Sequence, residues 1–179
     1  MGGDGTLHEV LNGIKDTENC TLGLIPLGSG NDFAEAAKIS KDVKTAAETI
    51  AFRAPVCIDY IELDNGLKSI NAVGSGIDVD VLQRAYAGKK KGKTKYFSAF
   101  LKSLRHYKAT SYTASWDGGE EKKFTGIIAC LGNGRQIGGG IKLFPDAEID
   151  DGYIDLLLVD YLSRFKTLVA FMKLTAGKV

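Results

Sequence analysis

The chain of 179 residues is 44% hydrophobic and 25% charged, which is enough sequence for one domain or two small ones with a buried core. Its 23 lysines and arginines nearly balance its 22 aspartates and glutamates, so a net charge of +1 argues against nucleic acid as a partner. No apolar run reaches the ~18–20 residues that a bilayer-spanning helix needs.

The three cysteines, Cys20, Cys57 and Cys130, lie far apart and form no C-x-x-C pair. Their odd number argues against a closed set of disulfides, and a reducing compartment such as the cytoplasm fits this pattern. We expect all three thiols to be buried without a chemical role, because free cysteine packs as a small hydrophobic residue.

The first 54 residues predict two strand–turn–helix units. The opening GGDGTLHEVLNG places a glycine turn before a helix that ends near Gly13. TLGLIP then predicts a short buried strand ending at Pro26, and LGSGNDFAEAAKI repeats the glycine turn before a helix from Asn31 or Asp32. A third helix is predicted over KDVKTAAETIAF. Successive units of this kind indicate a parallel α/β layer. The apolar positions of the first helix are Leu7, Val10, Leu11 and Ile14.

From residue 55 onward, short alternating or apolar runs are typical of antiparallel strands. The predicted strands are VCIDYIEL, KSINAVGSGIDVDV, TSYTASWD, KFTGIIACLGNG and YIDLLLVDYL. A helix over TKYFSAFLKSLRHY interrupts them, and a last helix over SRFKTLVAFMKLTAG has Ser163 as its N-cap. The expected fold class is therefore an α/β layer, residues 1–54, followed by a β-rich, sandwich-like domain with helices, residues 55–179.

Two features of the second part have alternative interpretations. The apolar stripe of the interrupting helix indicates core packing, which we favour, or contact with lipid. The lysine run before it indicates a solvated loop or attraction to anionic headgroups. The stripe comprises Tyr96, Phe97, Phe100, Leu101 and Leu104. The lysine run comprises Lys89, Lys90, Lys91, Lys93 and Lys95.

The glycine turns suit phosphate binding. Glycine lets the backbone approach a phosphate closely, and the helix that follows adds its positive end. One such turn is equally consistent with an ordinary strand-to-helix connection. Two at the ends of neighbouring parallel strands would face one crevice, with Thr6, Ser29 and Asn31 supplying side-chain donors. Asp4 differs, because a carboxylate beside phosphates needs a metal, a hydroxyl or a cation.

The segment PDAEIDDGYID gathers five carboxylates within ten residues. Such a cluster suits a hard cation such as Mg²⁺, which takes oxygen ligands. A solvated acidic turn before the strand YIDLLLV is the alternative, and the residues alone favour it.

Four motifs, taken together, resemble the bacterial diacylglycerol kinase family. They are GGDGTLHEVLNG, IPLGSGNDFA, NAVGSGIDVDV and GNGRQIGGGIKLFPDAEIDDG, in the order and spacing of that family. The resemblance covers essentially the whole chain and extends to sphingosine kinases and, in fold, to NAD kinase. It implies an α/β nucleotide domain, a β-sandwich domain, ATP as cofactor and a lipid hydroxyl as acceptor, at the inner face of the membrane. A homodimer is a candidate assembly.

By position, the resemblance assigns the following residues. The nucleotide is bound through Gly2, Gly3, Asp4, Gly5, Thr6, Glu9, Gly28, Ser29 and Asn31. Magnesium is bound through Glu148, Asp151 and the carbonyl of Tyr153, of which Glu148 is the weaker match.

The family's general base is an Asp in a later Asp-Gly-Glu motif, and no such motif follows residue 152. The family's Asn-Pro-x-x-Gly segment, which precedes the GGDG turn, is also not found. We therefore read the chain as an internal piece of a longer lipid kinase and expect no activity from residues 1–179 alone. An NAD kinase relative and a catalytically inactive nucleotide- or lipid-binding module are the alternatives.

Overall fold

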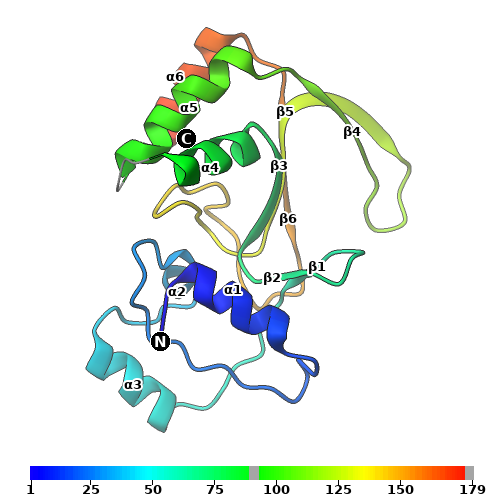
Figure 1. Ribbon diagram of the computed structural model, residues 1–179. Helices are drawn as coiled ribbons and strands as arrows, with labels where there is room; N and C mark the ends of the chain where they lie inside the picture. The colour runs from blue at the N-terminus through cyan, green and yellow to red at the C-terminus, as the bar shows by residue number, and fades with distance from the viewer. Residues whose placement is uncertain (89–92, 176–179) are drawn as a thin grey trace. The chain divides into compact units, whose positions relative to one another are not determined.

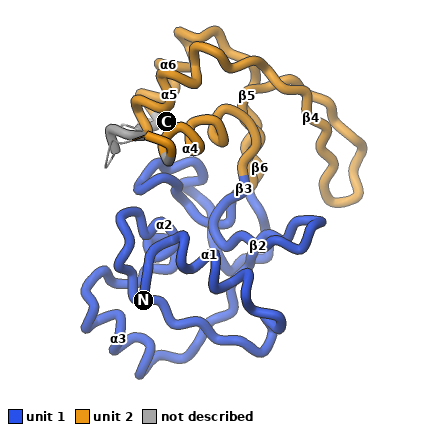
Figure 2. The backbone as a smooth tube through the Cα atoms, viewed as in Figure 1, with its two compact units in different colours: residues 1–73, 132–155 blue, residues 74–131, 156–179 orange. Residues whose placement is uncertain are grey.

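The computed structural model describes residues 1–88 and 93–175 and divides into two compact units. Unit 1 comprises residues 1–73 and 132–155, and unit 2 comprises residues 74–131 and 156–179 (Figure 2). Each unit therefore takes two separate stretches of the chain. The predicted junction near residue 54 stays a prediction. Over the described residues, no helix is both long and apolar enough to cross a membrane.

Unit 1 contains three helices: α1 (Asp4–Gly13), α2 (Asp32–Ala36) and α3 (Val43–Phe52) (Figure 1). The sequence predicted all three, with starts within about two residues of those observed. Its two short strands, β1 (Ile61–Glu62) and β2 (Lys68–Ser69), pair antiparallel. The core of unit 1 forms around Leu7, Leu11, Phe33 and Ile70. Leu7 and Leu11 lie one helical turn apart on α1, so both face this core.

Some predicted features of unit 1 are wrong. TLGLIP forms one parallel bridge, Gly2 with Pro26, and VCIDYIEL is a strand only at β1. Cys20 and Cys57 are exposed, and only Cys130 is buried. A short apolar run becomes a strand only where a partner backbone pairs along its length.

Unit 2 is built around a sheet with the strand order β3-β5-β4, in which β6 also pairs with β5 (Figure 1). Its strands are β3 (Ala72–Gly76), β4 (Thr110–Ala114), β5 (Lys122–Gly132) and β6 (Asp155–Asp160). The hairpin β4–β5 is antiparallel and pairs Tyr112 with Phe124. Its helices are α4 (Ile77–Ala87), α5 (Lys93–His106) and α6 (Arg164–Thr175). The predicted fold class, an α/β part followed by a β-rich part with helices, is confirmed.

The predicted strand over KSINAVGSGIDVDV is wrong in its second half. The chain leaves β3 at Gly76, whose φ of +138° favours glycine, and enters α4. IDVDV alternates like a strand, but Ile77 and Ala85 are both buried and lie eight residues apart, on one face of a helix. Short alternating runs do not separate the two structures by periodicity alone.

The aromatic stripe of α5 divides between two faces. Phe100 is 4% exposed and stacks on Phe171 of α6, with ring centroids 3.8 Å apart. Phe97 and Leu101 are 45% and 39% exposed. The core interpretation therefore holds for Phe100 and is wrong for Phe97 and Leu101.

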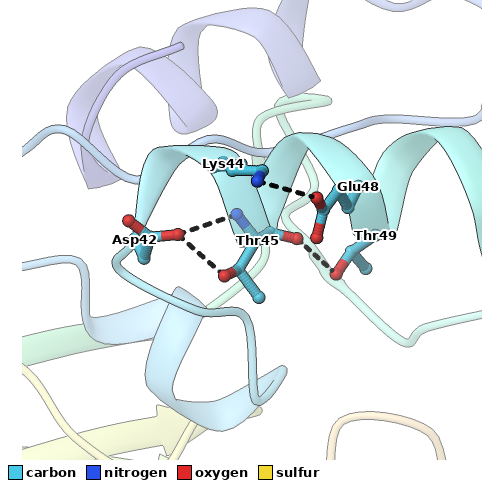
Figure 3. Close-up of polar contacts among 5 residues, drawn as sticks. All are labelled: Asp42, Lys44, Thr45, Glu48 and Thr49. Atoms are coloured by element: carbon cyan, nitrogen blue, oxygen red, sulfur yellow. Dashed lines mark hydrogen bonds and ion pairs between the residues drawn. The ribbon is translucent and has the colours of Figure 1, made fainter.

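The N-cap of α3 leads to a first testable prediction. The Asp42 carboxylate accepts from the amide of Thr45 at 2.9 Å and from its hydroxyl at 2.7 Å (Figure 3). These hydrogen bonds hold the pKa of Asp42 below its ordinary value, so the charged cap is present above that pKa and is lost as the pH falls. We expect Asp42→Ala to lower the melting temperature at neutral pH by about 2–4 °C, measured by circular dichroism.

Lys44→Gln is the matched control on the same helix. Lys44 and Glu48 are 3.9 Å apart, and both side chains are more than half exposed (Figure 3). Exposed pairs of this kind contribute little to stability. An equal loss for both variants would show that the cap has no special role.

Candidate functional site

The two glycine turns lie side by side in unit 1. The amide of Gly2 donates to the carbonyl of Ile25 at 3.1 Å, and the amide of Leu27 donates to the carbonyl of Gly2 at 2.9 Å. This pair of hydrogen bonds forms the parallel bridge between Gly2 and Pro26. The segments that enter the two turns therefore run in the same direction, as the sequence predicted.

The turns touch backbone to backbone. A Cβ placed on Gly3 would lie 2.7 Å from the Cα of Gly28, and one placed on Gly28 would lie 2.5 Å from the Cα of Gly3. Real Cβ atoms do not approach other atoms this closely, so both positions require glycine for packing. This contact holds the start of α1 beside the segment that leads into α2.

Asn31 holds the second turn in shape. Its Oδ1 accepts from the amide of Gly28 at 2.8 Å, and its Nδ2 donates to the carbonyl of Gly28 at 2.7 Å. The residue is 8% exposed and adopts a left-handed conformation with φ of 56°, which asparagine tolerates better than most residues. Both ends of its amide are thus used within the turn.

Asp4 connects the first turn to α2. Its Oδ1 accepts from the amide of Phe33 at 3.2 Å. A Cβ on Gly30 would lie 2.8 Å from the Asp4 Oδ2, so glycine at 30 leaves room for this carboxylate. Asp4 therefore binds a backbone amide in the first turn of α2.

Asp32 holds a third glycine-rich segment beside the two glycine turns. It is 5% exposed, and its two carboxylate oxygens accept from the amide of Gly139 at 2.9 and 3.2 Å. Burial raises the pKa of Asp32 above its ordinary value, and the nearby Asp4 carboxylate adds to this rise. The hydrogen bond from Gly139 acts in the opposite direction. The pKa of this carboxyl is therefore held up mainly by desolvation.

The third segment is a tight loop with three glycines at its tip. Ile137 and Ile141 exchange two backbone hydrogen bonds of 2.9 Å. Gly138, Gly139 and Gly140 all have positive φ, between 63° and 116°, which favours glycine at each position. Three glycine-rich segments, around residues 2–5, 28–30 and 138–140, thus meet at Asp4 and Asp32.

The other predicted nucleotide-binding residues are exposed to solvent. Gly5, Thr6 and Glu9 are exposed along α1, and Ser29 is exposed in the second turn. The first helical hydrogen bond runs from the amide of Leu7 to the carbonyl of Gly3, so the amides of residues 4–6 precede the helical ladder. Their binding of a nucleotide stays a prediction.

The predicted metal residues lie in an exposed turn of unit 1. The Asp151 Oδ1 accepts from the amide of Tyr153 at 3.0 Å, and the amide of Gly152 donates to Asp59 Oδ2 at 2.8 Å. Asp151 and Glu148 offer the carboxylate oxygens that Mg²⁺ takes. Within the described part of the chain, no group of three or more His, Cys, Asp or Glu side chains gathers as a metal cluster, and Mg²⁺ needs only one or two carboxylates. The predicted set consists of two carboxylates and one carbonyl, so its binding of Mg²⁺ stays a prediction.

Sequence reasoning assigned no role to three residues that shape unit 1. Asp32 and Asp59 each accept a backbone amide from a distant segment, at Gly139 and Gly152. Asn133 is fully buried, and its Nδ2 donates to the carbonyls of Asp59 and Ile70 at 2.8 and 2.9 Å. The run of three glycines at 138–140 was the one signal in the sequence that a close approach occurs there.

Two family models match the chain over nearly its whole length. Residues 71–179 match the YegS C-terminal NAD kinase beta sandwich-like domain, and residues 1–63 match the diacylglycerol kinase catalytic domain. The chain belongs to the bacterial lipid kinase family of YegS and the diacylglycerol kinases. The resemblance expected from the four motifs is confirmed.

Curated relatives carry names from the same family. A probable lipid kinase YegS-like protein of Xanthomonas campestris pv. campestris is 36% identical over 99% of this chain and 60% of the relative. A diacylglycerol kinase of Staphylococcus aureus is 34% identical over 89% of this chain and 51% of the relative. The chain thus spans about half to three fifths of the length of these lipid kinase relatives.

Solved structures share the fold of this chain. Two structures from Bacillus anthracis strain Sterne, one titled a putative diacylglycerol kinase and the other a diacylglycerol kinase, superpose with TM-scores of 0.73 and 0.70, at 26% and 24% identity. They cover 99% and 96% of this chain, which spans 58% and 56% of theirs. A lipid kinase fold is therefore shared along almost the entire chain.

Proposed function

We propose that this lipid kinase chain takes part in transfer of the γ-phosphoryl group of ATP to a lipid hydroxyl, with diacylglycerol converted to phosphatidic acid. The observation that carries the proposal is the contact of Gly3 with Gly28, which joins the GGDGT and GSGND turns within one unit. Backbone amides gathered in this way bind the phosphates of a nucleotide.

In this proposal, some residues of the two turns would contact the phosphates and others would keep the turns in shape. The amides at the start of α1 and the Ser29 hydroxyl would contact phosphate oxygens, with Thr6 and Glu9 along the same exposed side of α1. Asn31 would contribute by keeping the Gly28 turn in shape, since its amide is already bonded to Gly28. Phosphoryl transfer depends mostly on alignment and charge neutralisation, so a rigid set of donors accounts for much of the rate.

We infer that Mg²⁺, if the longer protein binds it through Glu148, Asp151 and the carbonyl of Tyr153, supplies positive charge near the phosphates. We assign no general base among the described residues. The acceptor lipid places the reaction at a membrane surface, so we propose a cytoplasmic enzyme that associates peripherally with the inner face of the membrane. A homodimer belongs to the same proposal.

An NAD kinase-like activity is the second candidate. The model that matches residues 71–179 describes an NAD kinase beta sandwich-like domain, and NAD also presents a hydroxyl as phosphoryl acceptor. The two candidates share ATP and differ in the acceptor. A binding module that holds nucleotide or lipid without catalysis is the third outcome to test.

The experiment compares acceptors side by side in the longer protein that contains this chain. It is incubated with radiolabelled ATP and, in separate reactions, diacylglycerol in mixed micelles or NAD. We expect labelled phosphatidic acid and no labelled NADP. Labelled NADP would favour the second candidate. Nucleotide binding without phosphorylation of either acceptor would favour the binding module.

A further inference from the structure

The facing helices α5 and α6 of unit 2 have an unusual charge composition. Their sequences, KTKYFSAFLKSLRH and RFKTLVAFMKLT, contain seven lysines and arginines and no aspartate or glutamate. The whole chain, by contrast, has 23 basic and 22 acidic residues. Positive charge is therefore concentrated on this pair of helices.

A groove of about 490 Å³ lies between α5 and α6. Leu101, Leu104, Phe165 and Leu168 provide its apolar lining, and Lys102, Arg105 and Arg164 provide its charged lining. All three cations are exposed, and Phe165 is 75% exposed. Apolar side chains beside cations, on helices that contain no acidic residue, are typical of surfaces that meet an anionic bilayer.

Further apolar side chains are exposed on the same two helices. Phe97, Val169 and Met172 are 45%, 37% and 54% exposed. Phe97 and the buried Phe100 both stack on Phe171, so this exposed patch rests on a fixed aromatic contact between the helices. The patch is therefore part of the packed fold of unit 2.

The helix α4, which packs against α5, carries an acidic residue that is already paired. Asp80 of α4 pairs with Arg84, with Nε and Oδ2 2.8 Å apart. Its pKa is lowered first by the hydrogen bond that Arg84 donates. This carboxylate is therefore paired within its own helix.

We propose that the α5–α6 groove, with Lys102, Arg105 and Arg164, docks the enzyme on a bilayer of anionic phospholipid. The three cations contact the lipid phosphates, and Phe165 and Leu101 enter the boundary between headgroups and acyl chains. The inference rests on the proposed lipid kinase function and specifies how that enzyme meets the membrane. The lysines at 89–91, considered for the same role from the sequence, lie outside the described residues.

Vesicle binding by the longer protein tests the proposal without any measurement of catalysis. The vesicles are phosphatidylcholine alone, or phosphatidylcholine and phosphatidylglycerol in equal parts, and binding is measured by sedimentation at low salt. We expect binding to the mixed vesicles only. Each basic residue near an anionic surface contributes ~1 kcal/mol, so Arg105→Gln with Arg164→Gln should lower vesicle affinity about 25-fold.

Matched variants keep the test independent of folding and of the proposed reaction. Lys15→Gln with Lys41→Gln removes the same charge from exposed positions of unit 1 and should leave vesicle binding nearly unchanged. Phe165→Ser should weaken binding without changing charge. Phosphorylation of a short-chain, dispersed diacylglycerol should be equal in all variants.

Two results would overturn the docking surface. One is vesicle binding by the double arginine variant that equals that of the wild type. The other is no vesicle binding by a wild-type protein that phosphorylates the dispersed lipid. If vesicle binding depends on the two arginines and no lipid is phosphorylated, the proposed function fails and the docking surface stands.

Discussion

Gly28→Ala should disrupt the candidate phosphate site. The added Cβ would lie 2.5 Å from the Cα of Gly3 and 2.8 Å from the Oδ1 of Asn31. The backbone of the first turn cannot rotate away as a side chain can, so the two turns must separate. Overpacking of this kind costs about 1–3 kcal/mol of folding free energy.

The effect on activity should exceed the effect on stability. A shift of about 1 Å in groups that align a substrate lowers the rate about 100-fold, so we expect a loss of that order in kcat/KM for ATP in the longer protein. Steady-state kinetics and urea unfolding of the same preparation give both quantities.

Gly13→Ala is the control for the Gly28 variant. A Cβ at Gly13 meets nothing within 4 Å, and the residue is exposed at the end of α1. The same substitution there should retain activity and stability. A Gly28→Ala protein with normal kinetics would show that the close contact of the turns has no functional role.

The sequence predicted those parts of the fold that are set by local signals. Helix α1 follows its glycine turn, and α3 follows Asp42, a residue type that caps helices. The four motifs predicted the family and, through it, the order of an α/β part and a β-rich part. For these helices and for the order of the two parts, the local sequence pattern and the family resemblance predicted the same structure.

What the sequence could not predict depends on contacts between distant residues. Asp32 and Gly139 are 107 positions apart. No pattern in either segment indicates that the Asp32 carboxylate accepts a hydrogen bond from the Gly139 amide. The burial of Phe100 depends on its stacking against Phe171 of another helix. Periodicity gives the width of an apolar stripe, and the neighbour decides how much of it is covered.

The Asp32 carboxyl should make stability depend on pH in a direction that can be stated in advance. Its pKa is raised in the folded protein, chiefly by burial, so the folded state holds this proton more tightly than the unfolded state does. Stability from this group is therefore greatest at low pH and declines as the pH rises from its unfolded value, near 3.8, through the raised folded value.

Two substitutions separate the charge of Asp32 from its hydrogen bonds. Asp32→Asn retains an oxygen that can accept from Gly139 and removes the desolvated charge, so its stability relative to the wild type should rise between pH 4 and neutral pH. Asp32→Ala leaves the Gly139 amide without its acceptor and should cost about 1–3 kcal/mol at neutral pH. Urea unfolding at a series of pH values measures both effects. Parallel pH profiles for Asp32→Asn and the wild type would show that this carboxyl titrates alike in the folded and unfolded states, and would remove burial as the factor that sets its pKa.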